Sequence, residues 1–164
     1  MSALTRMLAA RAEALTWLPE FNVLLFAFLL NLPWEFIQVP LFEGMTTKPH
    51  WEAVKGFTRA ALGDAAIMLV AYWGVAAMCE GRRWITRPIQ RTLWTLLSIC
   101  VCIAIAIEWL ALRGRWLATW RYSATMPVIP GLNVGLVPVL QWVVLPPLVT
   151  WLTERQLRGQ TAQS

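Results

Sequence analysis

The sequence predicts an all-α integral membrane protein, with four transmembrane helices and an N-terminal interfacial amphipathic helix. Hydrophobic residues make up 58% of the 164-residue chain and only 14% are charged, whereas soluble domains are about one quarter charged. Eleven tryptophans suit aromatic belts at the two membrane interfaces. A chain of this length forms one domain, so we expect residues 1–164 to be a single transmembrane helical domain.

Four windows are apolar over about the 20 residues that a transmembrane helix needs. They cover residues 19–41, 58–79, 92–112 and 131–152. Helices are expected because backbone amides in hydrocarbon must be satisfied within the segment. Pro138, Pro146 and Pro147 predict a kink or a break in the fourth helix. Gly131 and Gly135 at its start have the GxxxG spacing of closely packed membrane helices.

The ends of the chain predict its orientation in the membrane. Residues 1–18 carry leucines at near-helical spacing among charged residues, and we expect them to form a helix on the membrane surface. Four spans put both termini on one side. That side holds the basic segment GRRWITRPIQR (residues 81–91), and positive loops face the cytoplasm. We therefore expect a bacterial cytoplasmic membrane with both termini cytoplasmic.

The basic residues do not indicate nucleic-acid binding, although the net charge is +5. They are divided among short loops and form no single patch, which favours contact with anionic membrane lipids. Cys79, Cys100 and Cys102 lie in apolar stretches, and their odd number favours packing roles over a disulfide framework. No metal-binding spacing such as HxxxH is present, so we expect no metal site. The sequence leaves open whether the protein binds a cofactor.

Three acidic residues inside the predicted spans are the catalytic candidates: Glu35, Asp64 and Glu108. Charge in a bilayer is costly, so such residues usually face the bundle interior and mark function. Antiparallel threading puts all three about 6–9 Å below the same membrane boundary at 1.5 Å per residue. Carboxylates that lie close together in a low dielectric repel one another, so we expect the cluster to retain a proton. An acid beside a carboxylate forms an acid–base pair.

Neighbouring polar and aromatic residues complete the predicted site. Asn31, Glu35 and Gln38 are spaced i, i+4 and i+7, so they share one helix face. Trp34 and Trp109 each adjoin an acid, and their rings either stabilise a carbocation by cation–π attraction or simply pack. The candidates for substrate binding are Asn31, Trp34, Gln38, Trp109, Arg113, Arg115, Tyr122 and Asn133.

The segments NLPWEFIQ and EWLALRGRWLATWRYSATMPVIPGLNVGLVPVLQWVVLPPLVTW resemble small four-helix bacterial integral membrane proteins. Over residues 108–150, the Gly-x-Trp, the nearby Tyr122, the Gly-Leu turn and the Pro-headed apolar helix are also similar to lycopene-cyclase-type membrane domains. That resemblance implies a helical module that protonates a polyene and closes a ring, and hence an isoprenoid or carotenoid ligand. Pro138 is followed by Val139, Leu140 and Gln141 where that family has an acidic pair, so it assigns no catalytic residue.

Different classes of function remain after these observations. The leading hypothesis is an intramembrane acid–base enzyme, of isomerase or cyclase type, acting on an isoprenoid or another lipid. The alternative is a non-catalytic subunit or lipid-binding protein, as a homo- or hetero-oligomer, in which the acids pair with donors such as Arg113 and Arg115 to hold the helices together. A carrier would need polar residues continuing across the membrane, and Gln141 is the only deep candidate.

Overall fold

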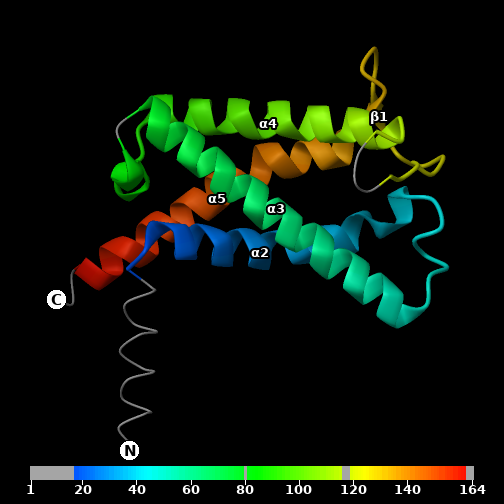
Figure 1. Ribbon diagram of the computed structural model, residues 1–164, viewed down its shortest axis with the longest axis horizontal. Helices are drawn as coiled ribbons and strands as arrows, with labels where there is room; N and C mark the ends of the chain where they lie inside the picture. The colour runs from blue at the N-terminus through cyan, green and yellow to red at the C-terminus, as the bar shows by residue number, and fades with distance from the viewer. Residues whose placement is uncertain (1–16, 80, 116–118, 162–164) are drawn as a thin grey trace, which may run out of the picture.

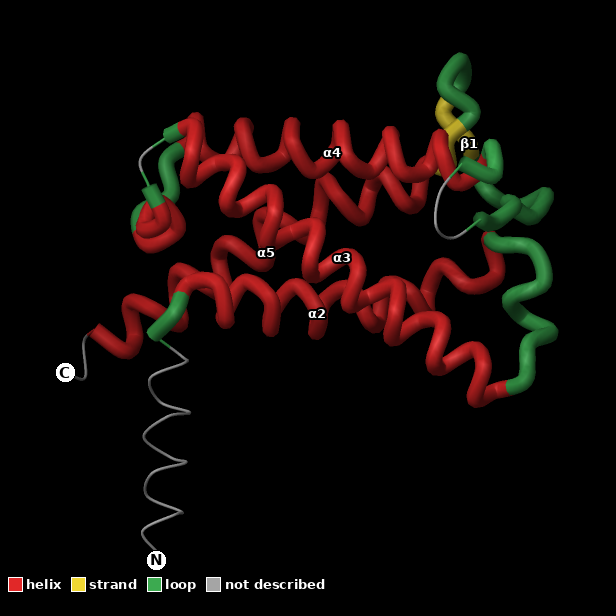
Figure 2. Tube along the Cα trace, in the orientation of Figure 1, coloured by secondary structure: helices red, strands yellow, loops and turns green. Residues whose placement is uncertain are grey.

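A computed structural model describes the chain over residues 17–79, 81–115 and 119–161. Within these ranges the architecture is helical apart from one short hairpin (Figures 1 and 2). The long helices are α2 (Pro19–Gln38), α3 (His50–Met78), α4 (Gln90–Leu112) and α5 (Leu136–Thr161). The short elements are the 3-10 turns η1 (Val39–Leu41) and η2 (Arg82–Thr86) and the strands β1 (Val128–Ile129) and β2 (Val134–Gly135). All four long helices have the length and apolar composition to cross a membrane, as the sequence predicts.

The four long helices run alternately in opposite directions. The start of α2 and the end of α5 lie at one end of the bundle, together with η2, and we call this the terminal end (Figure 1). The segments that join α2 to α3 and α4 to α5 lie at the opposite end, which we call the loop end (Figure 2). α2 packs against α3 and α5, and α4 packs against α5 and α3. The first three helices therefore bring the C-terminal part of α2, the N-terminal half of α3 and the C-terminal part of α4 toward the loop end.

Small side chains allow the helices to approach closely. Ala27, Ala65, Ala71 and Ala104 are buried in the core, as is typical of helix contacts in membranes, where packing rather than water exclusion drives association. Gly74 on α3 faces α4, because an added Cβ would lie only 3.2 Å from the side chain of Ile99.

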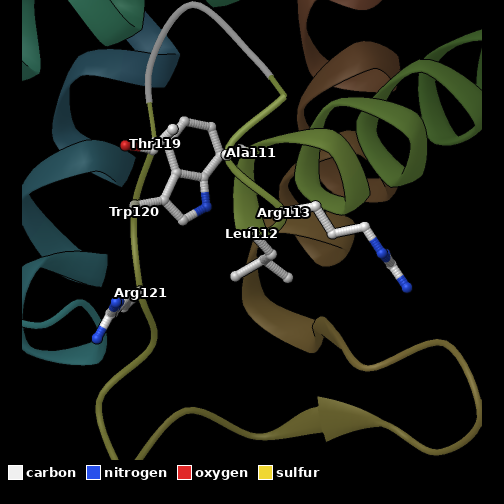
Figure 3. Close-up of a pocket in the computed structure, with 7 residues that line it drawn as sticks. Ala111, Leu112, Arg113, Thr119, Trp120 and Arg121 are labelled. Carbon is white, nitrogen blue, oxygen red and sulfur yellow. The ribbon is translucent and has the colours of Figure 1, made fainter.

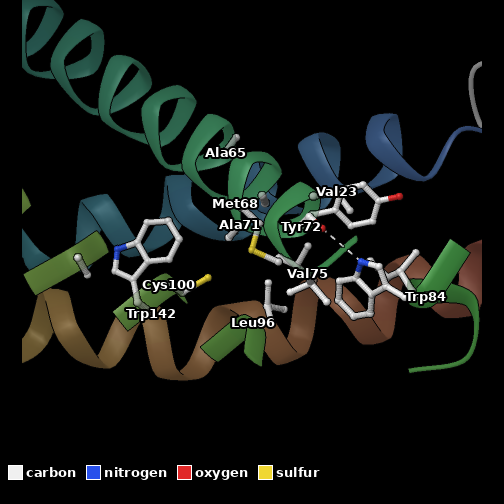
Figure 4. Packing of buried hydrophobic residues seen from close by; sticks show 14 of the residues in the cluster. Val23, Ala65, Met68, Ala71, Tyr72, Val75, Trp84, Leu96, Cys100 and Trp142 are labelled. Carbon is white, nitrogen blue, oxygen red and sulfur yellow. Dashed lines mark hydrogen bonds between the residues drawn. The ribbon is translucent and has the colours of Figure 1, made fainter. Parts of the chain in front are cut away.

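The terminal end of the core is held by hydrogen bonds to the η2 turn. The Trp84 indole Nε1 donates to the Tyr72 carbonyl at 3.3 Å, and the two rings lie close together (Figure 4). The Tyr72 hydroxyl donates to the Arg82 carbonyl. The Arg82 guanidinium forms an ion pair with Glu20 at 2.6 Å, which links η2 to the start of α2. The turn between α3 and α4 is thus tied to two helices.

The connections at the loop end are bonded to one another. Phe42, which follows η1, forms an isolated antiparallel bridge with Tyr122. The Ser123 amide donates to the Leu41 carbonyl at 2.9 Å, and the Ser123 hydroxyl donates to the Pro40 carbonyl at 3.0 Å. The segment that follows α4 is therefore fastened to the end of α2, although about 80 residues separate them in sequence.

Two helix boundaries differ from the sequence prediction. α3 begins at His50 rather than at residue 58, because helical structure continues through the charged turn containing Glu52 and Lys55, which form an ion pair at 2.6 Å. α5 begins at Leu136 rather than at residue 131. The GxxxG interpretation of Gly131 and Gly135 is wrong, because both belong to the hairpin and Gly131 has a φ of 84° that a helix does not use.

The prolines of the fourth helix do not break it. Pro138 is the third residue of α5, where a backbone donor has no intrahelical partner in any case. Pro146 and Pro147 lie inside α5, which continues to Thr161. All three cysteines are free, and Cys100 is buried in the core while Cys102 is exposed. The predicted surface helix over residues 1–18 falls almost wholly outside the described residues, of which the first is Trp17.

Candidate functional site

Glu35 on α2 and Asp64 on α3 form a carboxyl pair inside the bundle. Their side chains lie within hydrogen-bonding reach of each other, and both carboxyl groups are largely shielded from solvent. An ionised carboxylate has no hydrogen to donate, so a hydrogen bond between two carboxyl groups needs one proton between them. We call these two residues the Glu35–Asp64 pair. Such a pair holds a proton in a setting where two separate charges would repel each other.

Gln141 on α5 joins this pair to α2. Its side-chain Nε2 donates to Asp64 Oδ2 at 2.8 Å and to Asn31 Oδ1 at 2.6 Å. Asn31 is oriented in turn by a 2.7 Å bond from its Nδ2 to the Ala27 carbonyl. One amide of α5 therefore connects polar groups of α2 and α3.

Gln38 is the second amide that touches the pair. Its Nε2 donates to Glu35 Oε1 at 2.8 Å, one turn further along α2. Asn31, Glu35 and Gln38 thus lie on the face that their i, i+4, i+7 spacing predicts. Asn31 and Gln38 are buried, so this face is directed into the protein and not toward lipid.

Glu108 on α4 is held by a different set of donors. It is buried, and its Oε2 accepts from the Trp120 indole Nε1 at 3.0 Å and from the Tyr122 hydroxyl. The Gly135 amide donates to the Tyr122 oxygen at 2.8 Å. Because that oxygen already accepts from Gly135, the Tyr122 hydroxyl hydrogen is directed at Glu108. Glu108 is consequently an acceptor of two hydrogen bonds on one oxygen.

Tyr122 lies outside the membrane-spanning helices and keeps its proton strongly. Burial, and then the hydrogen bond to Glu108, raise the pKa of Tyr122 well above 10.0, the usual value of a phenol. Gly135 leaves room for this ring, because an added Cβ there would meet the Tyr122 ring at 3.0 Å and the Met126 sulfur at 3.1 Å. The hairpin therefore positions Tyr122 by close approach as well as by a hydrogen bond.

The three intramembrane acids lie close enough for their charges to interact. Glu108 interacts with both Glu35 and Asp64 through their charges. It is not part of the directly bonded pair. Over the described ranges, no group of three or more His, Cys, Asp or Glu residues is arranged to hold a metal ion. The acids thus divide into a bonded pair and a single carboxyl with its own donors.

The arginines near the site do not neutralise these acids. The Arg113 guanidinium lies 3.8 Å from the centre of the Trp109 ring and its Nη1 is 3.4 Å from the Trp109 carbonyl. Arg115 is exposed. In the part of the chain that the structure describes, the side-chain ion pairs are Lys55–Glu52, Arg82–Glu20 and Arg158–Glu154. The interpretation that Arg113 and Arg115 pair with the intramembrane acids is therefore wrong.

The side chains of two other sequence candidates are exposed. Trp109 is 39% exposed and lines an open apolar groove on α4 with Cys102, Ile105, Ala106 and Leu110. Asn133 is exposed in the hairpin turn, where its φ is 54°. Trp34 remains close to the acids on α2, and its indole Nε1 is buried.

A pocket of about 400 Å³ opens beside Glu108 at the end of α4 (Figure 3). Arg113, Thr119, Trp120 and Arg121 are among the residues that line it. The Trp120 ring stands in this pocket, whereas the Arg113 side chain extends away from it (Figure 3). Trp120 also donates to Glu108, so this residue contacts both the pocket and that carboxyl group.

Gln141 and Trp120 are the site residues that the sequence does not assign to the acids. The signal for Gln141 is its position, because an amide inside an apolar span needs a partner within the protein. Trp120 carries no such signal, because the sequence has eleven tryptophans and most suit the membrane interface.

No protein-family model matches this chain, and no similar curated protein or solved structure is found. The interpretation of the site therefore depends on the chemistry of its own residues.

Proposed function

We propose that this protein is an intramembrane acid–base enzyme that isomerises or cyclises an isoprenoid or another lipid. The observation that carries the proposal is the Glu35–Asp64 pair, which needs one proton for its hydrogen bond, near a third carboxyl that accepts hydrogen bonds. A proton source and a proton acceptor are the two groups that double-bond isomerisation requires. The resemblance over residues 108–150 to lycopene-cyclase-type domains agrees with this chemistry.

The roles of the acids follow from their donors. The Glu35–Asp64 pair delivers its proton to one carbon of a double bond, and the π electrons form the new C–H bond. The carbocation then loses a proton from a neighbouring carbon to Glu108, and the electrons of that C–H bond form the new double bond. Glu108 suits this role because the hydrogen bonds from Trp120 and Tyr122 stabilise its ionised form. The proton passes back from Glu108 to the pair before the next turnover, so no oxidant or reductant is needed.

The position of the pair supports a lipid substrate, because Glu35 and Asp64 both lie in helices able to span a membrane. We further propose that the membrane is a bacterial cytoplasmic membrane with both termini in the cytoplasm. The support is the basic cluster of Arg82, Arg83, Arg87 and Arg91 in and beside the turn between α3 and α4 at the terminal end, because short cytoplasmic loops are enriched in such residues.

Conservative replacements of the acids test the proposal. Glu35→Gln, Asp64→Asn and Glu108→Gln each remove an ionisable group while keeping its size. Glu43→Gln is the matched control, because Glu43 is an exposed acid at the same end of the bundle. The wild type, expressed in a host that makes isoprenoids, is expected to change the lipid extract, and the three site variants are expected to abolish that change. If the folded variants give the same lipid products as the wild type, the enzyme proposal is contradicted.

A second candidate function is a non-catalytic subunit or lipid-binding protein. The hydrogen bonds from Gln141 to Asn31 and Asp64 favour it, because they satisfy buried groups of three helices and stabilise their register. Exposed tryptophans such as Trp73, Trp94 and Trp151 offer an aromatic surface for lipid, a second copy or another subunit. In this case the same three variants lower the melting temperature in detergent and alter no lipid product.

A further inference from the structure

Two buried polar atoms close to the Glu35–Asp64 pair have no hydrogen-bond partner among the described residues. They are the Trp34 indole Nε1, which is a donor, and the Gln38 amide Oε1, which is an acceptor. Gln38 is only 5% exposed, and its Nε2 is already bonded to Glu35. Buried polar groups are nearly always satisfied in folded proteins. An unsatisfied donor and an unsatisfied acceptor on one helix therefore point to a ligand.

The spacing of these residues suits one small polar group. Trp34 and Gln38 are four residues apart on α2, so they lie one above the other on the same face, about 6 Å apart at their Cβ atoms. A hydroxyl group both accepts and donates, so one oxygen can accept from Trp34 and donate to Gln38. A hydrocarbon satisfies neither atom, and an ether satisfies only the donor.

We propose that Trp34 and Gln38 bind the hydroxyl group of a lipid alcohol. This inference rests on the proposed function and narrows its substrate to an alcohol with an isoprenoid chain. The amide of Gln38 would then fix the alcohol beside Glu35, because the same side chain contacts both. Binding at this point places the hydroxyl-bearing end of the molecule within one helical turn of the proton-bearing pair.

Native mass spectrometry of the full chain in detergent tests this binding. The probes are geranylgeraniol, its methyl ether, a hydrocarbon with the same isoprenoid chain, and oleyl alcohol. We expect geranylgeraniol to bind about tenfold more tightly than its methyl ether or the hydrocarbon, as for loss of one buried hydrogen bond. Gln38→Leu and Trp34→Phe are each expected to weaken geranylgeraniol binding by about the same factor, with little effect on the hydrocarbon.

The controls keep the inference falsifiable. Gln156→Leu and Trp51→Phe make the same chemical changes at exposed positions, and they are expected to leave binding unchanged. If Gln38→Leu does not fold, the affinities of the wild type for the alcohol, the ether and the hydrocarbon still show whether a hydroxyl group is bound. Equal affinity for these three probes would mean that only water occupies the position, and would overturn the inference. Tight binding of oleyl alcohol with none of geranylgeraniol would support the hydroxyl site and contradict the isoprenoid substrate.

Discussion

Gln141 Nε2 on α5 lies 2.8 Å from Asp64 Oδ2 on α3, which makes an amide the direct neighbour of the proton-sharing pair. The same nitrogen lies 2.6 Å from Asn31 Oδ1 on α2. An amide is a neutral donor, so it binds either protonation state of Asp64 without introducing a charge. This contact lets three helices meet at a polar point inside the membrane while the acids remain free to exchange a proton.

Removal of the amide should destabilise the bundle. Gln141→Leu leaves Asp64 and Asn31 without their shared donor, and a buried group without its partner costs about 1–3 kcal/mol. The expected result is a melting temperature in detergent that is several degrees lower than that of the wild type. Gln156→Leu, on the exposed side of the same helix, is the control. Equal melting temperatures for Gln141→Leu and the wild type would show that the contact does not stabilise the helices.

Gly135 and Gly63 should respond in opposite directions to the same substitution. Gly135→Ala places a Cβ 3.0 Å from the Tyr122 ring, so we expect a loss of about 1–3 kcal/mol from overpacking and displacement of Tyr122 from Glu108. Gly63→Ala lies in α3 with nothing within 4 Å of the new Cβ, and it should stabilise the helix by up to about 1 kcal/mol. Thermal melts of the two variants measure whether each substitution lowers or raises the stability of the protein. A neutral Gly135→Ala would contradict the close approach of the hairpin to Tyr122.

Tyr122 should remain protonated to unusually high pH. Its folded pKa is raised above the 10.0 of an ordinary phenol by burial and by Glu108. Between pH 10.0 and that higher value, the folded protein holds a proton that the unfolded chain has lost. The contribution of Tyr122 to stability is therefore complete below pH 10.0 and is lost as the pH rises through the folded pKa.

Phenolate absorbance measures this titration directly. The chain has two tyrosines, so a Tyr72→Phe variant reports on Tyr122 alone. We expect its midpoint in the folded protein to lie well above that of the same variant in denaturant. A Glu108→Gln substitution in this background should lower the midpoint. Identical midpoints in the folded and the denatured chain would contradict the burial of Tyr122 against Glu108.

The sequence predicts the four membrane helices, because a segment that crosses a bilayer must be apolar over its whole length. It does not predict where each helix begins and ends. A span must match the bilayer, so the apolar windows identify α2 and α4 almost to their termini. Helical structure can continue beyond the bilayer, and this explains why α3 begins at His50. At the fourth helix, Gly131 and Asn133 both have positive φ. These residues form the hairpin turn, and the GxxxG spacing gives no indication of it.

The acids were predictable as a group, but their partners were not. Glu35, Asp64 and Glu108 stand out because charge is rare in apolar spans, and helix periodicity puts Asn31 and Gln38 beside Glu35. The donors to Glu108 come from the segment after α4, whose position depends on its backbone bonds to residues 40–43. Arg113 was expected near the acids because of its sequence position, but it stacks on Trp109 instead.

Infrared difference spectroscopy at neutral pH tests most directly whether the Glu35–Asp64 pair holds a proton. The C=O stretching band of a protonated carboxylic acid should be present in the wild type and shift on transfer to deuterated water. Subtraction of the Asp64→Asn spectrum should leave that band as a positive difference, with Glu43→Gln giving none. If the difference between the wild-type and Asp64→Asn spectra contains only ionised carboxylate bands and no carboxylic acid band, the pair does not share a proton. That result would contradict the proposed chemistry.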